Sequence, residues 1–228
     1  MAFVPGGTFI MGSGDEQGGT LAHERTTPDF SIDVTEVTAA AYDVCLLAGA
    51  CTPTESSELG ANSGQSEYSH YPVNYVTLDQ AEAYCAWMGK RLPTETEWEY
   101  AAGARQGLEY PWGSMPAAAC LPGLIPDPEA LDSDYDHGCA VGQFPSNDNG
   151  VEDVGGGVYE YTSTPYCPYS DTTSTGYIDC NTELVALRGG AFTSSGKELA
   201  RVSFRQSAPR DFAGANTGFR CARDAERD

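Results

Sequence analysis

Helix signals occur only in the first half of this chain. There, three threonines each precede a short segment that ends at a glycine. The segments span residues 38–49, 77–89 and 94–103. Threonine is a favoured helix N-cap, and glycine is a favoured helix terminator. In the second and third segments, Gln80 and Glu97 stand three residues after the threonine and complete a capping box. We therefore expect about three short helices, all before residue 104.

Residues 107–183 lack helical periodicity and carry clusters of Pro, Gly, Asp and Asn between short apolar pieces. Such clusters are typical of turns and loops. Strands are expected at residues 4–11, 184–188 and 219–223. No repeat and no long linker divides the chain, and 40% hydrophobic content in 228 residues suffices for a sizeable core. The sequence predicts a single α+β domain, residues 1–228, with short sheets and many irregular loops.

The charge of the chain is strongly negative and unevenly distributed. The net charge is −21; residues 1–187 hold 28 acidic and 4 basic side chains, whereas residues 188–228 hold 5 and 8. A polyphosphate or an anionic membrane would meet repulsion over most of this surface, which argues against nucleic acid as a partner. No run approaches the roughly 20 apolar residues of a membrane helix, so we expect no membrane insertion. The acidity either keeps an extracellular protein soluble or, in part, ligates cations.

Eight cysteines occur without a Cys-x-x-Cys pair or a His-rich tract that would indicate zinc. An even count favours disulfides, which require an oxidising compartment. The chain begins Met1-Ala2-Phe3 without the basic and apolar regions of a signal peptide. We therefore expect a periplasmic, cell-surface or secreted protein whose targeting segment was removed, with Met1 added for expression.

A set of short motifs follows in order from one end of the chain to the other. The motifs are FVPGGTFIMGS at 3–13, ID at 32–33, EVT at 36–38, PVN at 72–74, AYCAW at 83–87, GKRLPTE at 89–95, WEYAA at 98–102, PWG at 111–113, LRGG at 187–190 and GFRC at 218–221. This ordered set resembles the formylglycine-generating enzyme, or sulfatase-modifying factor, superfamily. The resemblance implies a fold related to C-type lectins. Its members include copper-dependent oxidases of sulfatase cysteines, iron-dependent sulfoxide synthases and domains without known activity, so the fold does not fix the function.

Catalytic members of that superfamily bind copper(I) through two cysteines five residues apart, just after a Gly-Gly turn. The corresponding run here, residues 189–201, contains no cysteine. Ser194 stands in place of the first cysteine, and Ala191 replaces a serine that lines the family's site. The segment is also about two residues shorter than in catalytic relatives. Because copper(I) prefers soft thiolates, hydroxyl groups do not substitute for them. The resemblance therefore predicts no copper, with Ser194, Ala191 and Arg201 as candidate pocket residues only.

Other chemistries find little support in the sequence. The iron-dependent relatives use histidines from a separate helical domain, and His23, His70 and His137 form no metal-binding pattern on a helix. A hydrolase built on Ser194 or Ser195 would lack the Gly-x-Ser-x-Gly elbow. The leading hypothesis is a noncatalytic binding, scaffold or assembly module for a protein, peptide or glycan, or for further copies of itself. The alternative is an oxidoreductase that modifies a protein side chain with a diverged site.

The resemblance also implies a disulfide framework. Family members pair the cysteine before the KRLPTE motif with that of GFRC, which are Cys85 and Cys221 here. Eight cysteines allow 105 pairings, and the remaining six pair most economically as neighbours. We therefore predict Cys45 with Cys51, Cys120 with Cys139, and Cys167 with Cys180.

Residues 153–161 are similar to the family's calcium segment. The ligand roles implied by the resemblance fall on the side chains of Asp153 and Glu160 and on the carbonyls of Gly156 and Val158. These are the hard oxygen donors that calcium prefers. The alternative is a turn with solvated acids.

A second cation site is implied less clearly, at Asp134 and the carbonyl of Asp136. The partner segment of that site has no clear match, so a solvated loop is an equal alternative.

The late arginines are spread over strands and turns. We expect them to pair with buried or half-buried carboxylates such as Glu95, Glu97 and Glu99. The alternative is an anion or peptide site beside Gly189 and Gly190. The arginines are Arg188, Arg201, Arg205, Arg210, Arg220 and Arg223.

Overall fold

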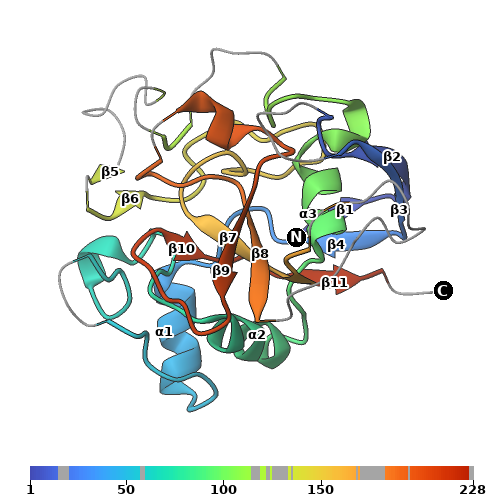
Figure 1. The fold of residues 1–228 in the computed structure, drawn as a ribbon. Helices are drawn as coiled ribbons and strands as arrows, with labels where there is room; N and C mark the ends of the chain where they lie inside the picture. Colours follow the sequence, from blue (N-terminus) through green and yellow to red (C-terminus); the bar gives the residue numbers. More distant parts are fainter. Residues whose placement is uncertain are drawn as a thin grey trace.

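The computed structural model describes residues 1–14, 21–56, 60–113, 119–121, 124, 133–134, 136–167, 169, 183–194 and 196–225. Short sheets lie beside three α-helices, and long irregular segments connect them (Figure 1). The predicted α+β class is therefore confirmed over this part of the chain. None of its helices is long and apolar enough to cross a membrane.

The α-helices begin at the predicted threonine caps. They are α1 (Ala39–Leu47), α2 (Leu78–Trp87) and α3 (Glu95–Ala102). Each preceding threonine accepts a hydrogen bond from a backbone N–H of the first turn, and Gln80 and Glu97 complete the boxes of α2 and α3. Gly103 ends α3 at a φ of 139°, where an L side chain would be strained. The described residues also form the 3₁₀ helices η1 (Ser66–Tyr68), η2 (Ala104–Gln106) and η3 (Lys197–Ala200).

The described strands form two main sheets and two ribbons. The larger sheet has the order β10 (Thr217–Gly218), β7 (Tyr159–Pro165), β8 (Leu184–Arg188) and β9 (Arg205–Pro209), with β10 parallel to β7 and the other pairs antiparallel. The second sheet places β4 (Phe30–Ile32) between β1 (Ala2–Val4) and β11 (Ala222–Asp224). The ribbons are β2 (Gly7–Met11) with β3 (His23–Thr27), and β5 (Ser133–Asp134) with β6 (Gly138–Cys139).

Two predicted strands have different boundaries in the structure. The first is interrupted at Gly6, where a Cβ would lie 2.5 Å from the backbone of Thr27 and Pro28, and the Gly6 N–H donates to Asp29 instead of continuing a ladder. Residues 219–221 of the strand predicted at 219–223 form the connection between β10 and β11, and residues 222–223 belong to β11. That connection bonds to the loop before α1, because the Phe219 carbonyl accepts from the Val37 N–H.

Three of the four predicted disulfides are present, namely Cys45–Cys51, Cys85–Cys221 and Cys120–Cys139. The Cys85–Cys221 bond ties α2 to the residue before β11. Cys167 is also disulfide-bonded, and its predicted partner, Cys180, lies outside the described residues.

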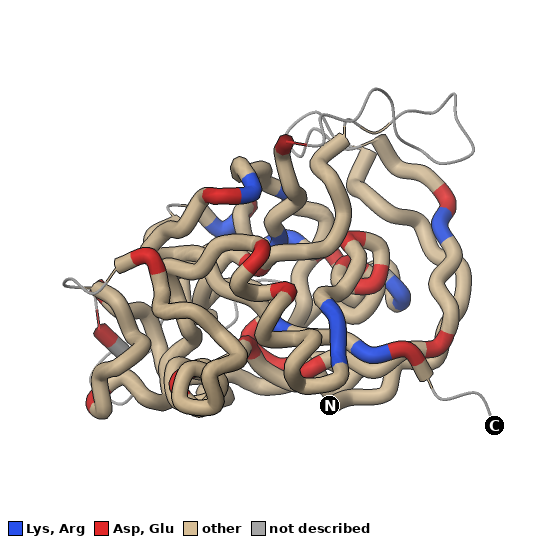
Figure 2. Tube along the Cα trace, turned by 90° about the horizontal axis from the view of Figure 1, so that it is seen from below, with Lys and Arg blue, Asp and Glu red and all other residues tan. Residues whose placement is uncertain are grey.

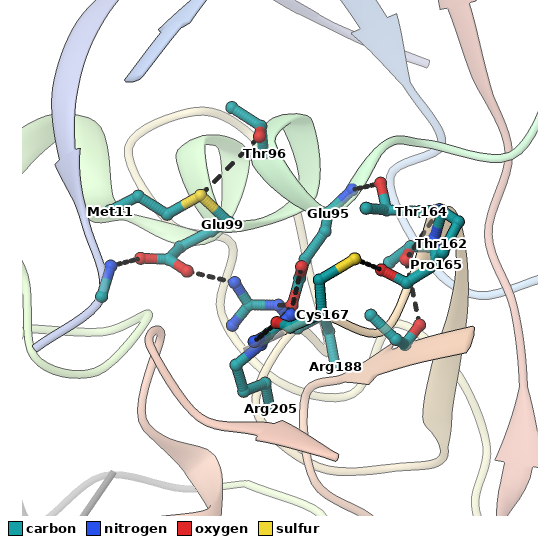
Figure 3. Close-up of polar contacts among 12 residues, drawn as sticks. Met11, Glu95, Thr96, Glu99, Thr162, Thr164, Pro165, Cys167, Arg188 and Arg205 are labelled. Atoms are coloured by element: carbon teal, nitrogen blue, oxygen red, sulfur yellow. Dashed lines mark hydrogen bonds and ion pairs between the residues drawn. The ribbon is translucent and has the colours of Figure 1, made fainter. Parts of the chain in front are cut away.

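A buried network of ion pairs joins α3 to the larger sheet (Figure 3). Arg188 is fully buried between Glu95, whose Oε1 lies 3.1 Å from its Nε, and Glu99, which accepts from its Nη2. Arg205 donates to both oxygens of Glu95 at 2.7 Å. Burial raises the pKa of Glu99, and the charge of Arg188 opposes that shift. The architectural role predicted for these two arginines is confirmed.

Glu97 has a different partner from the one expected. It accepts two hydrogen bonds from Arg91, which precedes α3, and not from a late arginine. Figure 2 marks the Asp and Glu positions along the described trace, together with the fewer Lys and Arg positions. Ion pairs with Asp or Glu are formed by Lys90 and by Arg91, Arg188, Arg201, Arg205, Arg210 and Arg220.

Candidate functional site

The segment predicted to bind calcium is a glycine-rich turn that leads into β7. Asp153 adopts a φ of 56°, in the left-handed region. A Cβ at Gly156 would lie 2.8 Å from the Cys120 carbonyl, and one at Gly157 would lie 2.3 Å from Oε1 of Glu36. Gly156, at a φ of 136° and against backbone, therefore requires glycine, whereas Gly157 approaches only the side chain of Glu36. The glycine at 157, which departs from the family's usual Asn, leaves the space that Glu36 fills.

Glu160, the predicted carboxylate ligand at the end of this turn, accepts three side-chain hydrogen bonds. Arg220 donates to its two oxygens at 2.7 and 2.8 Å, and Trp98 donates from Nε1 at 2.8 Å. Both members of the ion pair are completely buried. The geometry assigns Glu160 to a structural ion pair that fixes the start of β7.

Glu36 and Asp153 are partly unpartnered beside that ion pair. Glu36 is 2% exposed and neither of its oxygens has a hydrogen-bond partner; Nη2 of Arg220 lies 3.8 Å from Oε2. Asp153 accepts from the Gly142 N–H at 2.5 Å through Oδ2, whereas its buried Oδ1 has no partner. A cavity of about 10 Å³ lies between them, lined also by Gly157. This is the space that one water molecule or small ion occupies.

The two carboxyl groups carry more negative charge than their surroundings balance. Burial raises the pKa of Glu36 well above its usual range, and the charge of Asp153 adds to the effect while Arg220 opposes it. Burial likewise raises the pKa of Asp153 to about 6, against the hydrogen bond from Gly142 and the charge of Arg220. One guanidinium therefore faces three carboxylates. Protons or a cation must offset the remaining charge, since isolated charges are costly to bury.

The donor set fits a hard cation. Among the described residues, no three or more His, Cys, Asp or Glu side chains are arranged to hold a metal ion. A cation here would need backbone carbonyls or water beside the carboxylates, and calcium accepts both. The predicted carbonyl donors Gly156 and Val158 belong to the same turn. Glu36 was missed by the sequence reasoning, although it lies in the EVT motif quoted above.

The second predicted cation site has the geometry of a self-bonded turn. Oδ1 of Asp134 accepts from the Asp136 N–H at 2.8 Å, and Oδ2 lies 3.5 Å from the Tyr68 hydroxyl. Both aspartates are exposed. The second cation site stays a prediction.

The turn after Gly189 and Gly190 is closed by its own hydrogen bonds. Ser194 is 6% exposed, and its Oγ lies 3.0 Å from the Ala191 N–H, which donates to it, and 2.9 Å from the Tyr159 hydroxyl. The Ser194 N–H donates back to the Ala191 carbonyl at 2.7 Å. Arg201 pairs with Glu109 at 3.1 Å. None of the described cysteines is a free thiol, and Ser195 lies outside the described residues.

Known proteins similar to this chain are of both active and inactive kinds. Inactive C-alpha-formylglycine-generating enzyme 2 from Bos taurus is 37% identical over 177 residues, which cover 74% of this chain and 55% of that protein. Formylglycine-generating enzyme from Streptomyces coelicolor is 33% identical over 179 residues, covering 73% of this chain and 57% of the enzyme. The chain thus spans just over half the length of these curated relatives.

The fold and the sequence lead to the same family. The solved structure of PvdO from Pseudomonas aeruginosa has a TM-score of 0.77 at 28% identity, over 98% of this chain and 93% of PvdO. The model of the sulfatase-modifying factor enzyme 1-like domain matches residues 1–225. The chain belongs to that family.

Proposed function

We propose that this domain is a noncatalytic member of its family, which binds or assembles with other molecules outside the cytoplasm and holds a calcium ion beside β7. The single observation that carries the first part is the closed turn around Ser194. Relatives named as active and as inactive both match the chain, so the site itself has to decide between them.

The turn offers hard and already engaged groups where copper(I) would need sulfur. The Ser194 hydroxyl is bonded to the Ala191 N–H and the Tyr159 hydroxyl. Cysteine is absent from residues 181–220 altogether. Thiolates are the ligands that select copper(I) in proteins, and a buried hydroxyl does not replace them.

The calcium part of the proposal is supported by the unpartnered oxygens of Glu36 and Asp153. These two side chains, with the carbonyls of Gly156 and Val158, would hold the ion. When bound, calcium supplies two positive charges to a cavity whose carboxylates share one arginine. The role is structural, because the ion fixes the turn that enters β7.

The extracytoplasmic location is supported by the disulfides, which persist in oxidising compartments. The partner class that suits such a module is a protein, a peptide, a glycan or another copy of the domain. Nucleic acid is disfavoured by the net charge of −21.

Copper(I) titration followed by X-ray absorption at the copper edge tests the noncatalytic assignment. The Streptomyces coelicolor enzyme serves as the positive control. We expect no sulfur-ligated copper in this domain under conditions that load the control. Stoichiometric copper with sulfur ligands would overturn the assignment in favour of a diverged oxidoreductase that acts on a protein side chain.

A further inference from the structure

A cavity of about 370 Å³ borders the glycine-rich turn that leads into β7. It is bounded by the turn around residues 108–113, by residues 144–148 and by residues 151–157. It shares Cys120, Phe144, Asp153 and Gly157 with the small cation cavity. Its apolar lining comprises Leu108, Pro111, Trp112, Phe144, Val151 and Val154. Cavities of this volume and character commonly hold small ligands.

One wall of this pocket is fixed by close aromatic packing. The Trp112 indole lies so close to Gly155 that a Cβ there would be 2.6 Å from the ring. Tyr110 stacks on the indole, with ring centroids 5.9 Å apart and planes inclined by 10°. The Gly113 N–H donates to the Tyr110 carbonyl at 2.9 Å and closes the turn that carries both rings. The indole is therefore positioned before any ligand arrives.

The facing wall is held by a hydrogen-bonded loop. Asn147 donates through Nδ2 to the Ala101 carbonyl of α3 at 2.9 Å, and its Oδ1 accepts from the N–H groups of Asn149 and Val151. The Asn147 N–H donates to the Val151 carbonyl at 2.9 Å. A pocket whose two walls are already ordered binds without the cost of arranging them.

The charge of the lining selects the kind of ligand. Among the described residues that line the pocket, the ionisable side chains are Asp148 and Asp153, and both are acidic. Asp153 already contributes to the cation cavity, which leaves the exposed Asp148 to meet a ligand at the mouth. The faces of Trp112 and Phe144 also attract cations. These two carboxylates would repel an anionic ligand, and none of the described lining residues is basic.

We propose that this pocket binds a small organic cation, in which a primary ammonium group is carried on an aromatic body. The volume is more than twice the roughly 150 Å³ of an apolar cavity that holds benzene, so a ring and a short side chain fit. The ring lies between Trp112 and Phe144, and the ammonium lies toward Asp148. The same chemistry occurs in free aromatic amines and at the amino terminus of a peptide that begins with an aromatic residue. This gives a ligand class to the binding role proposed above.

The test compares three probes that carry the same phenyl ring on a two-carbon chain and differ in the charge of the end group: 2-phenylethylammonium, 2-phenylethanol and 3-phenylpropanoate. Binding is followed at pH 7 through the indole N–H signals in ¹H–¹⁵N spectra, with Trp87 and Trp98 as internal references. We expect the Trp112 signal to shift and the ammonium to bind at least tenfold tighter than the carboxylate, with the alcohol between them. Equal affinities, or shifts of all three indoles, would overturn the proposal. Phe-Gly-Gly amide is titrated as a fourth probe. Tighter binding of this peptide than of 2-phenylethylammonium would identify a peptide amino terminus as the preferred source, and weaker binding would identify a free amine.

Variants separate the charge from the cavity. Asp148→Asn is expected to lower the preference for the ammonium over the alcohol several-fold, because the carboxylate at the mouth is lost. Ser146→Trp, at an exposed lining position, is expected to abolish binding of all three probes by filling the mouth. Glu67→Gln, on the exposed 3₁₀ helix η1, is the control and should change neither. An unchanged preference in Asp148→Asn would refute the role of that carboxylate.

The titrations are run with calcium and with chelator. If the protein still prefers the ammonium probe in chelator, the pocket binds independently of the cation cavity. If no probe binds, the pocket proposal fails, whereas the copper titration still tests the noncatalytic assignment.

Discussion

Asp153 is a buried carboxyl group whose proton affinity differs between the folded and the unfolded chain. Its ordinary pKa is 3.8, and burial raises it to about 6 in the folded protein. Between these values the folded state holds more protons than the unfolded state. The free energy of unfolding therefore falls as pH rises through this window, because the folded protein must give up a proton that it binds more tightly.

The first prediction concerns this pH dependence without divalent cations. Chelated wild-type protein is expected to lose about 1–3 kcal/mol of stability between pH 4 and pH 7 through Asp153. Asp153→Asn keeps an oxygen for the Gly142 N–H and should remove most of that loss. Urea unfolding at several pH values in excess chelator measures both. Parallel curves for the two proteins would contradict the raised pKa.

The second prediction concerns Glu36, whose two oxygens lack hydrogen-bond partners. Calcium at a hundred times its dissociation constant should stabilise wild-type protein by about 2–3 kcal/mol, since it binds the folded state. Glu36→Gln should lose most of this response, and the exposed Glu67→Gln should keep it. Thermal unfolding with calcium or chelator at pH 7.5 measures the response. A chelator that leaves the wild-type melting temperature unchanged would disprove the calcium assignment.

At the scale of elements, the helices were predictable and several strand boundaries were not. Each helix begins at a threonine cap whose signal lies within four residues. The strand boundaries depend instead on distant segments, as at Gly6, which packs against Thr27 and Pro28. The residues of the cation cavity also combine a local sequence signal with a distant segment. Asp153 lies in a local motif, whereas Glu36 comes from the other half of the chain and became visible only once the fold placed it against Gly157.

The third prediction compares two disulfides that close loops of very different length. Cys85–Cys221 spans 136 residues and Cys45–Cys51 spans 6. In the chain-entropy model, replacing the first pair by serines should cost about 5 kcal/mol and replacing the second about 2 kcal/mol. Denaturant unfolding of the two double variants tests the difference. Equal losses would show that local packing, and not loop closure, sets the contribution.

At the scale of the whole molecule, the net charge of −21 sets the electrostatic background. Self-repulsion of this size destabilises the compact state, and salt screens it. The buried pairs of Arg188 and Arg220 are shielded from solvent and respond much less.

The fourth prediction follows from that repulsion. Raising potassium chloride from low to moderate ionic strength at pH 7, in the presence of chelator, should raise the melting temperature by roughly 2–4 °C, equivalent to about 1 kcal/mol for a domain of this size. Near the sequence pI of 4.2 the effect should vanish. A melting temperature independent of salt at pH 7 would mean that the acidic side chains are already neutralised.

The position of β4 has a consequence for how such a domain can be joined to others. β1 and β11 flank it on either side, so the first and last strands run in the same direction two strand spacings apart. Ala2 and Asp224 therefore lie at opposite ends of the same small sheet, so a domain joined before β1 and one joined after β11 would leave it on opposite sides. Removing β1 or β11 would leave one edge of β4 without its partner strand.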